Sequence, residues 1–186
     1  MPNAPALAAL LTLALATTTG QAIEVHFPVE IDNDGFEGIA ADTGTTLVAG
    51  QPTEEALRTL ASNGYSTVIN LRRPSEMDDR EKVSFDEAAL VEELGLTYVN
   101  IPLGGDDHPY SPAALGTFEQ AMAQAEGKVL LHCRSAWRAS QMWAAYLVSA
   151  QGFEPAEAVD HAEAINFDSV PMEDLLGRDL ELQFAE

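Results

Sequence analysis

The sequence predicts an α/β fold, with a central parallel sheet of about four strands flanked by helices. Three observations lead to this prediction. Strand-like and helix-like segments alternate four times after residue 46, the helices begin at capping residues, and hydrophobic residues make up 46% of the 186 residues. A regular alternation of strand and helix is typical of a parallel sheet with helices on both faces. The length and apolar content suit one domain with a sizeable core.

Four segments are predicted to be strands because each is short, apolar and bounded by turn or helix-start residues. They are residues 47–49, 67–71, 97–101 and 128–132. The segment before them, residues 23–46, is polar and rich in Asp and Gly. It is therefore expected to be a lead-in on the surface, with a short strand at 23–27, and the domain itself is expected to span 47–186.

Helices are predicted where apolar residues recur at helical spacing behind a capping residue. Thr53 is the expected N-cap of the first helix, and Gly64 is its stop. Ser111 is the expected cap of a later helix that opens at Pro112. The predicted helices cover 54–63, 84–94, a segment from 112, 139–151, 155–165 and 172–176.

The charge balance excludes some classes of partner. The chain has 9 Lys and Arg against 30 Asp and Glu, which gives a formal net charge of -21. A surface of this charge repels nucleic acid and anionic membranes. Neither is therefore expected as a binding partner.

Residues 1–22 have the features of a secretory signal peptide rather than of a folded segment. Ala6 to Ala16 is an apolar run, and the small residues Gly20 and Ala22 suit cleavage after Ala22. The run is shorter than the about 20 apolar residues that span a bilayer, so no stable membrane insertion is expected after cleavage. An uncleaved N-terminal anchor is the alternative, because no Lys or Arg precedes the run. The predicted location is the periplasm or the medium.

Basic residues gather where the predicted strands end. Arg72 and Arg73 follow the second strand and Arg134 and Arg138 follow the fourth, so four of the 9 basic residues lie there. Ligands of open parallel sheets bind beyond the carboxyl ends of the strands, which makes these arginines candidates for binding an anion. Ion pairing with a nearby acid such as Glu76 is the alternative, and it is favoured less for Arg138 than for Arg72 and Arg73.

The single cysteine, Cys133, lies between the fourth strand and the next helix. Loop amides and the helix N-terminus point at such a position, which favours a bound anion and the thiolate form of a cysteine. Arg138 can present two N–H groups to an oxyanion, which a lysine cannot do. Together these groups can stabilise charge on a transferred group. The residues expected to bind the substrate are Arg134, Ser135, Ala136, Trp137 and Arg72.

The four histidines give no sign of a metal site. His132 is expected to support the loop by hydrogen bonding. His26, His108 and His161 lack the spacing of metal ligands, so neither a metal nor a cofactor is expected.

The cysteine loop resembles that of protein-tyrosine and dual-specificity phosphatases, in which His-Cys is followed by five residues and an Arg. Only four residues separate Cys133 from Arg138. This shorter loop is similar to that of a bacterial branch, the beta-lactamase hydrolase-like phosphatase-like family. The resemblance covers roughly residues 48–151. Its matching stretches are Gly50-Gln51-Pro52-Thr53, Val68-Ile69-Asn70-Leu71-Arg72 with Glu76, Ile101-Pro102, His132-Cys133-Arg134-Ser135, Arg138 and Trp143.

The resemblance implies a cysteine-phosphatase-like fold and chemistry. It implies that Cys133 is the nucleophile that forms a phosphocysteine, that Arg138 clamps the anion, and that the substrate is a small phosphorylated or other oxyanion compound. Phosphatases of this type draw a general acid from the loop after the preceding strand, where Asp106 and Asp107 lie. Asp107 is slightly favoured. The alternative is that both are surface acids of an acidic protein.

The sequence departs from the family at two positions. Ala136 stands where the family usually has Gly, and alanine costs about 1 kcal/mol if the backbone keeps a positive φ. Ala139 follows Arg138, where many phosphatases have a Ser or Thr whose hydroxyl helps to release the thiolate, and Ser140 comes one residue later. Both departures bear on turnover more than on binding.

Two alternatives to a phosphatase follow from the same residues. Rhodanese-like sulfurtransferases also place four residues between Cys and Arg, and a small loop suits a persulfide on Cys133. However, rhodaneses carry Asp-Val-Arg where this chain has Asn70-Leu71-Arg72, which favours the phosphatase-like prediction. The second alternative is a non-catalytic anion-binding or redox-sensing module, which Ala136 and the missing hydroxyl favour.

Overall fold

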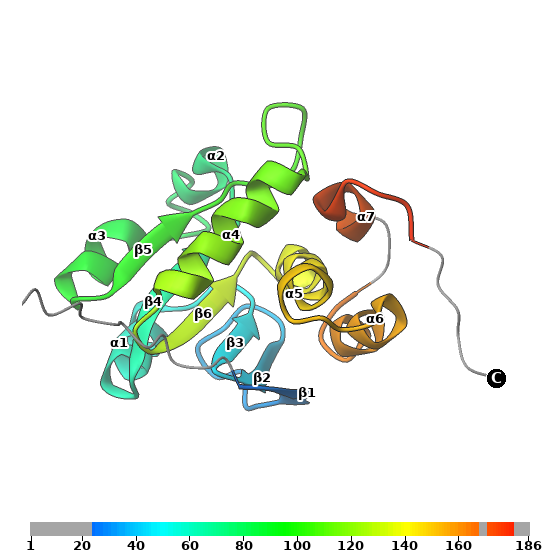
Figure 1. The fold of residues 1–186 in the computed structure, drawn as a ribbon. Coiled ribbons are helices and arrows are strands. Elements are labelled where there is room, and N and C mark those ends of the chain that lie inside the picture. The colour runs from blue at the N-terminus through cyan, green and yellow to red at the C-terminus, as the bar shows by residue number, and fades with distance from the viewer. Residues whose placement is uncertain (1–23, 168–170, 181–186) are drawn as a thin grey trace, which may run out of the picture.

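Strands of both directions form one sheet in the computed structural model, which describes residues 24–167 and 171–180 (Figure 1). The six strands are β1 (Val25–Glu30), β2 (Ala40–Gly44), β3 (Thr46–Ala49), β4 (Tyr65–Asn70), β5 (Thr97–Asn100) and β6 (Lys128–His132). Their order across the sheet is β1-β2-β3-β6-β4-β5. β3, β6, β4 and β5 run parallel, whereas β1 and β2 pair in antiparallel fashion.

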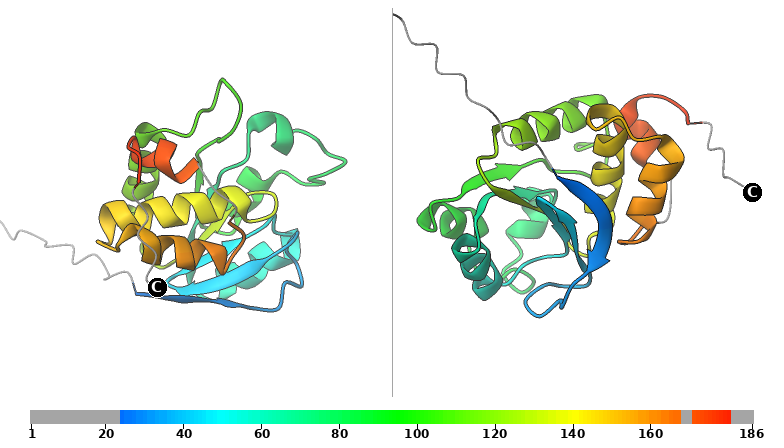
Figure 2. Two further views of the ribbon diagram at one scale, coloured as in Figure 1. Left: turned by 90° about the vertical axis from the view of Figure 1, so that its right-hand side faces the viewer. Right: turned by 60° about the horizontal axis from the view of Figure 1, so that its bottom comes forward.

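Helices cover both faces of the sheet. They are α1 (Glu54–Ser62), α2 (Pro74–Met77), α3 (Glu87–Glu93), α4 (Pro112–Gln124), α5 (Trp137–Ala150), α6 (Pro155–Glu163) and α7 (Pro171–Leu176). α1 and α3 pack on one face, over Leu47 and Leu130 of the strands. The helices α4 to α7 gather on the other face, over Val48 and Leu131 (Figure 2). The strands β2 to β6 thus contribute to two cores, because neighbouring residues of a strand point to opposite faces.

The predicted α/β fold is confirmed. The four predicted strands make the parallel part of the sheet, and β6 pairs with both β3 and β4. The predicted caps are also present, because the Ala56 amide donates to the Thr53 hydroxyl and the Ala114 amide donates to the Ser111 hydroxyl. As a result, the carboxyl ends of β3, β6 and β4 meet at one edge of the sheet.

The sheet extends further than the sequence predicts. Residues 23–46 are predicted to be a polar lead-in with a short strand at 23–27, but they contribute both β1 and β2 to the sheet. A strand at the edge of a sheet has one neighbour and one wet face, so its sequence lacks a continuous apolar run. Phe27 and Val29 of β1 are accordingly exposed, at 54% and 58%.

The predicted signal peptide, residues 1–22, lies outside the described residues, so cleavage after Ala22 and the periplasmic or extracellular location stay predictions. Between residues 24 and 167, and in 171–180, no helix is long and apolar enough to cross a bilayer.

Candidate active site

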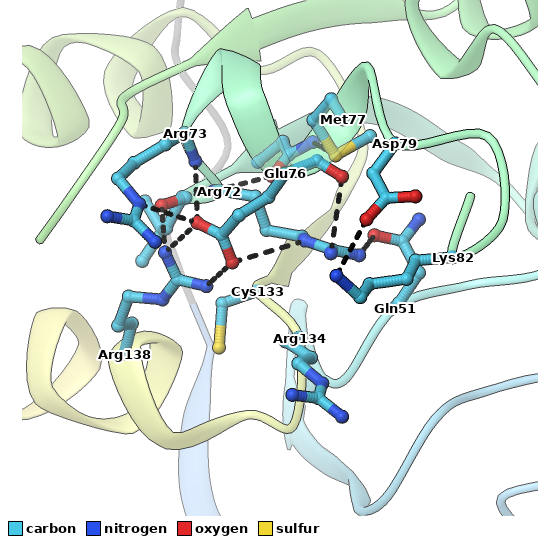
Figure 3. A network of polar contacts seen from close by, with 12 residues as sticks. Gln51, Arg72, Arg73, Glu76, Met77, Asp79, Lys82, Cys133, Arg134 and Arg138 are labelled. Carbon is cyan, nitrogen blue, oxygen red and sulfur yellow. Dashed lines mark hydrogen bonds and ion pairs between the residues drawn. The ribbon is translucent and has the colours of Figure 1, made fainter.

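Cys133 lies where the carboxyl ends of three parallel strands meet. It follows β6 directly, it is 1% exposed, and its amide donates to the Ala49 carbonyl at the end of β3. Gly50 allows two backbone segments to approach here, because a β-carbon at this position would overlap the Glu37 carbonyl oxygen and lie 2.8 Å from that of Arg134. Figure 3 shows the sulfur pointing into the turn between β6 and α5. The cysteine therefore lies at the predicted edge of the sheet, inside the turn.

Ala136 has a backbone conformation that glycine favours. Its φ of 67° and ψ of -7° lie in the left-handed region, and no other non-glycine residue within the described ranges has a positive φ. The loop thus keeps the geometry in which alanine costs about 1 kcal/mol. Ala136 is also the N-cap of α5, which therefore begins at Trp137, two residues before the predicted start at Ala139.

The start of α5 offers N–H groups to an anion. The N-cap residue Ala136 has no side-chain oxygen, so it cannot accept a hydrogen bond from the amides of the first turn. The amides of Arg134, Ser135 and Arg138 donate to no acceptor in the described part of the chain. Unpaired amides at the N-terminus of a helix favour negative charge in front of them, and here that position is the turn that holds Cys133.

Two polar side chains hold the loop from outside. The Asn166 amide donates to the Ser135 carbonyl at 2.6 Å. The Ser140 hydroxyl lies 2.8 Å from the carbonyl oxygens of Trp137 and Asn166. Ser140 is thus bonded to backbone carbonyls, and it does not replace the hydroxyl that many phosphatases carry directly after the arginine.

The Arg138 guanidinium is fixed close to Cys133. Nη1 donates to the Glu76 carboxylate at 2.8 Å and to the Leu103 carbonyl at 2.9 Å, while Nη2 donates to the second Glu76 oxygen at 2.8 Å. The side chain is 12% exposed. Within the described residues, Nε and the second hydrogen of Nη2 have no acceptor. Arg138 therefore keeps two N–H groups for an oxyanion while the rest of its guanidinium is held in place.

Glu76 brings three arginines together (Figure 3). Besides the two bonds from Arg138, it accepts hydrogen bonds from the amide and the side chain of Arg73 at 3.0 Å and lies 3.7 Å from Nε of Arg72. Burial raises the pKa of this carboxyl, but the hydrogen bonds from Arg138 and Arg73 and the Arg138 charge lower it to about 2. Ion pairing with Glu76, the alternative that the sequence favours less for Arg138 than for Arg72 and Arg73, therefore occurs at all three arginines, and it is shortest at Arg138. Arg138 thus forms an ion pair with Glu76 and still keeps N–H groups free for an anion.

The other two arginines predicted to bind the substrate have partners within the protein. Arg72 is 1% exposed and donates to the Gln51 side chain at 2.7 Å, so it supports the site from below and offers no surface to a substrate. Arg134 is exposed and its Nε donates to Glu37 at 2.9 Å. The turn that holds Cys133 is therefore lined by the backbone of residues 134–136 and not by the Arg134 side chain.

The candidate general acids lie on the loop between β5 and α4. Asp106 and Asp107 are exposed and have no hydrogen-bond or ion-pair partner in the described ranges, so the choice between them stays a prediction. Tyr110, at the end of the same loop, packs edge-to-face on Trp137 with ring centroids 6.4 Å apart. Burial raises the pKa of Tyr110 to about 12, although the nearby Arg138 charge acts in the opposite direction. This ring therefore forms one wall of the site.

Sequence reasoning missed the buried polar residues beneath the loop. Glu87 of α3 is 2% exposed and accepts hydrogen bonds from the side chains of Gln51 and Asn70. An acid in the first turn of a helix has the same sequence signature whether it is exposed or buried, so Glu87 gave no signal. Tyr110 was missed as well, and its place after the predicted acid loop is the signal that could have identified it.

No metal centre is evident in the part of the chain that the structure describes, where no group of three or more His, Cys, Asp and Glu side chains is placed to hold an ion. His26 lies 3.6 Å from Asp42, and His161 packs between the rings of Phe27 and Phe153.

Comparison with protein families gives a match over most of the sheet and the cysteine loop. The model for the phosphatase-like domain of beta-lactamase hydrolase-like proteins matches residues 39–150. A beta-lactamase hydrolase-like protein from Xylella fastidiosa is 33% identical over 97 residues, which are 52% of this chain and 22% of that protein. The matched region thus spans about a fifth of the length of this curated relative.

Solved structures share the fold. A candidate phosphatase (DUF442) from Shewanella putrefaciens CN-32 is 28% identical, with a TM-score of 0.58, and the match covers 77% of this chain and 91% of that one. PTPMT1, solved in complex with PI(5)P, has a TM-score of 0.59 at 19% identity, over 71% of this chain and 88% of that one. Both place the molecule among α/β proteins of the cysteine-phosphatase type.

Proposed function

Because the chain belongs to the beta-lactamase hydrolase-like protein family through its phosphatase-like domain, we propose that it is a cysteine-dependent phosphatase with Cys133 as its nucleophile. The geometry of Arg138 carries this proposal. Glu76 and the Leu103 carbonyl fix the guanidinium, while two of its N–H groups have no acceptor among the described residues. A fixed guanidinium with a free edge suits two oxygens of a phosphoryl group.

The proposed reaction has two steps. The Cys133 thiolate attacks phosphorus, so an S–P bond forms while the P–O bond of the ester breaks, and Asp107 gives its proton to the departing oxygen. Water then attacks the phosphocysteine and gives a proton to the Asp107 carboxylate, the S–P bond breaks, and inorganic phosphate leaves as the thiolate returns. In both steps Arg138 and the loop amides bind the non-bridging oxygens, where negative charge develops.

A small phosphorylated or other oxyanion compound is the proposed substrate. The N–H groups near the cysteine belong to one loop and one arginine, which is enough for a single phosphoryl group. The net charge of -21 disfavours a polyanion such as nucleic acid.

Hydrolysis of a generic aryl phosphate tests the proposal. The parent protein is expected to release phosphate and to carry a phosphoryl group on Cys133 after an acid quench, and Cys133→Ser is expected to do neither. A second assay supplies thiosulfate and cyanide. Formation of thiocyanate without phosphate release would establish sulfur transfer instead, and no turnover in either assay would leave an anion-binding module.

A further inference from the structure

Arg73 lies beside the Arg138 guanidinium and is much more exposed. Nε of Arg73 donates to one oxygen of the Glu76 carboxylate at 3.0 Å, and Nη1 of Arg138 donates to the same oxygen at 2.8 Å. The two guanidinium groups are therefore neighbours, as Figure 3 shows. The Arg73 side chain is 43% exposed, against 12% for Arg138. The site thus has a second guanidinium next to the anion clamp, and solvent reaches it.

Both Nη groups of Arg73 are free to bind a ligand. Of this guanidinium, only Nε has an acceptor within the described residues. Asp106 and Asp107 lie on a neighbouring loop, but neither forms an ion pair with Arg73 in the described ranges. The Nη groups form the flat edge of the guanidinium, and this edge matches two oxygens of a carboxylate or a phosphate.

Arg73 borders the same space as the cysteine and the acid loop. A β-carbon at Gly105 would lie 3.6 Å from Nη1 of Arg73, so the guanidinium lies against the loop between β5 and α4. Burial is the main cause that raises the pKa of Tyr110, while the Arg138 charge lowers it, the Cys133 charge raises it and the Arg73 charge lowers it further. The Tyr110 ring is therefore close to all three charged groups, and Arg73 lies near the place where the phosphoryl group would bind.

The positive charges of this cluster outnumber the carboxylates that contact them. Arg72, Arg73 and Arg138 all contact the single Glu76 carboxylate, which cannot neutralise three cations. Arg72 is buried and donates to Gln51. Arg138 holds the position next to the cysteine. The charge that another part of the substrate can reach is therefore that of Arg73.

We propose that Arg73 binds a second anionic group of the substrate. The preferred substrate is then a phosphate ester that carries a carboxylate or a second phosphate a few bonds from the phosphoryl group. The spacing is short because Arg73 and Arg138 donate to the same Glu76 oxygen. This inference rests on the proposed function, because it assigns a specificity-determining residue to the same site. If Arg73 served only to hold Glu76, ligands with one and with two anionic groups would depend on it equally.

Two phosphonates of equal length test the proposal, because a C–P bond is not hydrolysed. 3-Phosphonopropanoate carries a carboxylate where 3-phosphonopropanamide carries a neutral amide. In titration calorimetry the parent protein is expected to bind the carboxylate at least about five-fold more tightly. Arg73→Gln is expected to bind both ligands with similar affinity. Similar affinities in the parent, a result that does not depend on the folding of any variant, would overturn the proposal. So would a preference that survives in Arg73→Gln.

Arg134→Gln is the matched control, because it removes the same charge from an exposed arginine of the cysteine loop, where the side chain pairs with Glu37. It is expected to keep the preference for the carboxylate. An equal loss of preference in both variants would mean that the ligands respond to the overall charge of the site and not to contact with Arg73, and it would overturn the proposal.

Ethane-1,2-bisphosphonate distinguishes the two sources of the second anionic group. If it binds more tightly than 3-phosphonopropanoate and depends on Arg73 in the same way, the second group is a phosphate, and the reverse order indicates a carboxylate. These measurements require no turnover. Failure to hydrolyse an aryl phosphate, with the preference intact, would therefore contradict the proposed function alone, and hydrolysis without the preference would contradict this inference alone.

Discussion

At Ala136 two opposing effects meet in one residue. Its left-handed backbone costs an L-residue about 1 to 2 kcal/mol, whereas its side chain is fully buried in the larger core. Burial of one methyl group stabilises the fold by about 0.8 kcal/mol. The two terms nearly cancel, so replacing this alanine by glycine is expected to change the stability of the protein little.

Ala136→Gly is expected to raise kcat/KM for an aryl phosphate, or to tighten oxyanion binding, by about five-fold, because glycine relieves about 1 kcal/mol of strain. The free energy of unfolding is expected to change by less than about 1 kcal/mol. Ala139→Gly is the control, and as an ordinary helix position it is expected to lose about 1 kcal/mol of stability without gaining rate. No improvement in the Ala136 variant would mean that alanine fits this loop, and would favour sulfur transfer or binding.

Arg138→Lys is expected to weaken binding of phosphate or vanadate by at least about ten-fold, or about 1.4 kcal/mol, in titration calorimetry. One ammonium cannot hold the contacts to Glu76 and Leu103 and also present two N–H groups to the ligand. Arg134→Lys makes the same change in the same loop at an exposed residue, and it is expected to bind like the parent. Parental affinity in Arg138→Lys would contradict the assigned role.

At the scale of elements, sequence reasoning succeeds where a boundary has a chemical signal. β6 is predicted to the residue, and α4 begins at Pro112 because Ser111 caps it. The start of α5 was predicted two residues too late. Its N-cap is Ala136, and an alanine gives no sequence signal for a helix start. β2 was missed because its sequence has no apolar pattern. Only its backbone pairing with β3 identifies it as a strand.

The candidate site divides in the same way. Cys133 and Arg138 belong to one short loop, so their proximity could be predicted from the sequence. The contacts of Glu76 with Arg138 and of Glu87 with His132 depend on how α2 and α3 pack against the end of the sheet. Such contacts join residues more than 40 positions apart, and no local pattern reports them.

Glu76 on α2 links that short helix to α5, so its loss is expected to destabilise the fold. Glu76→Gln is expected to lower the free energy of unfolding by about 3 kcal/mol at neutral pH, because it leaves the largely buried Arg138 and Arg72 without a carboxylate. Urea unfolding of parent and variant measures the difference. Glu93→Gln, an exposed acid, is expected to have almost no effect.

The same difference is expected to depend on pH in a defined direction. The pKa of Glu76 is lowered from 4.5 to about 2 in the folded protein, so its stabilising contribution is complete above the unfolded value and is lost as the pH falls through the folded value. The gap between parent and Glu76→Gln should stay constant down to about pH 5 and shrink between about pH 4.5 and pH 2. A gap that closes at higher pH would contradict the strength of the Arg138 clamp.

For the whole molecule, charge is distributed very unevenly between surface and site. The chain carries 30 acidic residues against 9 basic ones. Arg72 is buried, Arg138 is largely buried, and the exposed Arg134 pairs with Glu37. The positive charge that would bind an oxyanion thus lies inside a strongly negative shell.

This burial of the arginines has a kinetic consequence. A dianionic substrate has to cross a repulsive field before it meets Arg138, so dissolved salt is expected to hasten its capture by screening the surface. Raising sodium chloride from about 10 mM to about 500 mM should increase kcat/KM for an aryl phosphate by at least about two-fold. The alkylation rate with uncharged iodoacetamide should change little, which provides the control. A decrease in kcat/KM would instead mean that the approach path attracts anions. If the increase is found, the protein captures its substrate fastest in saline surroundings.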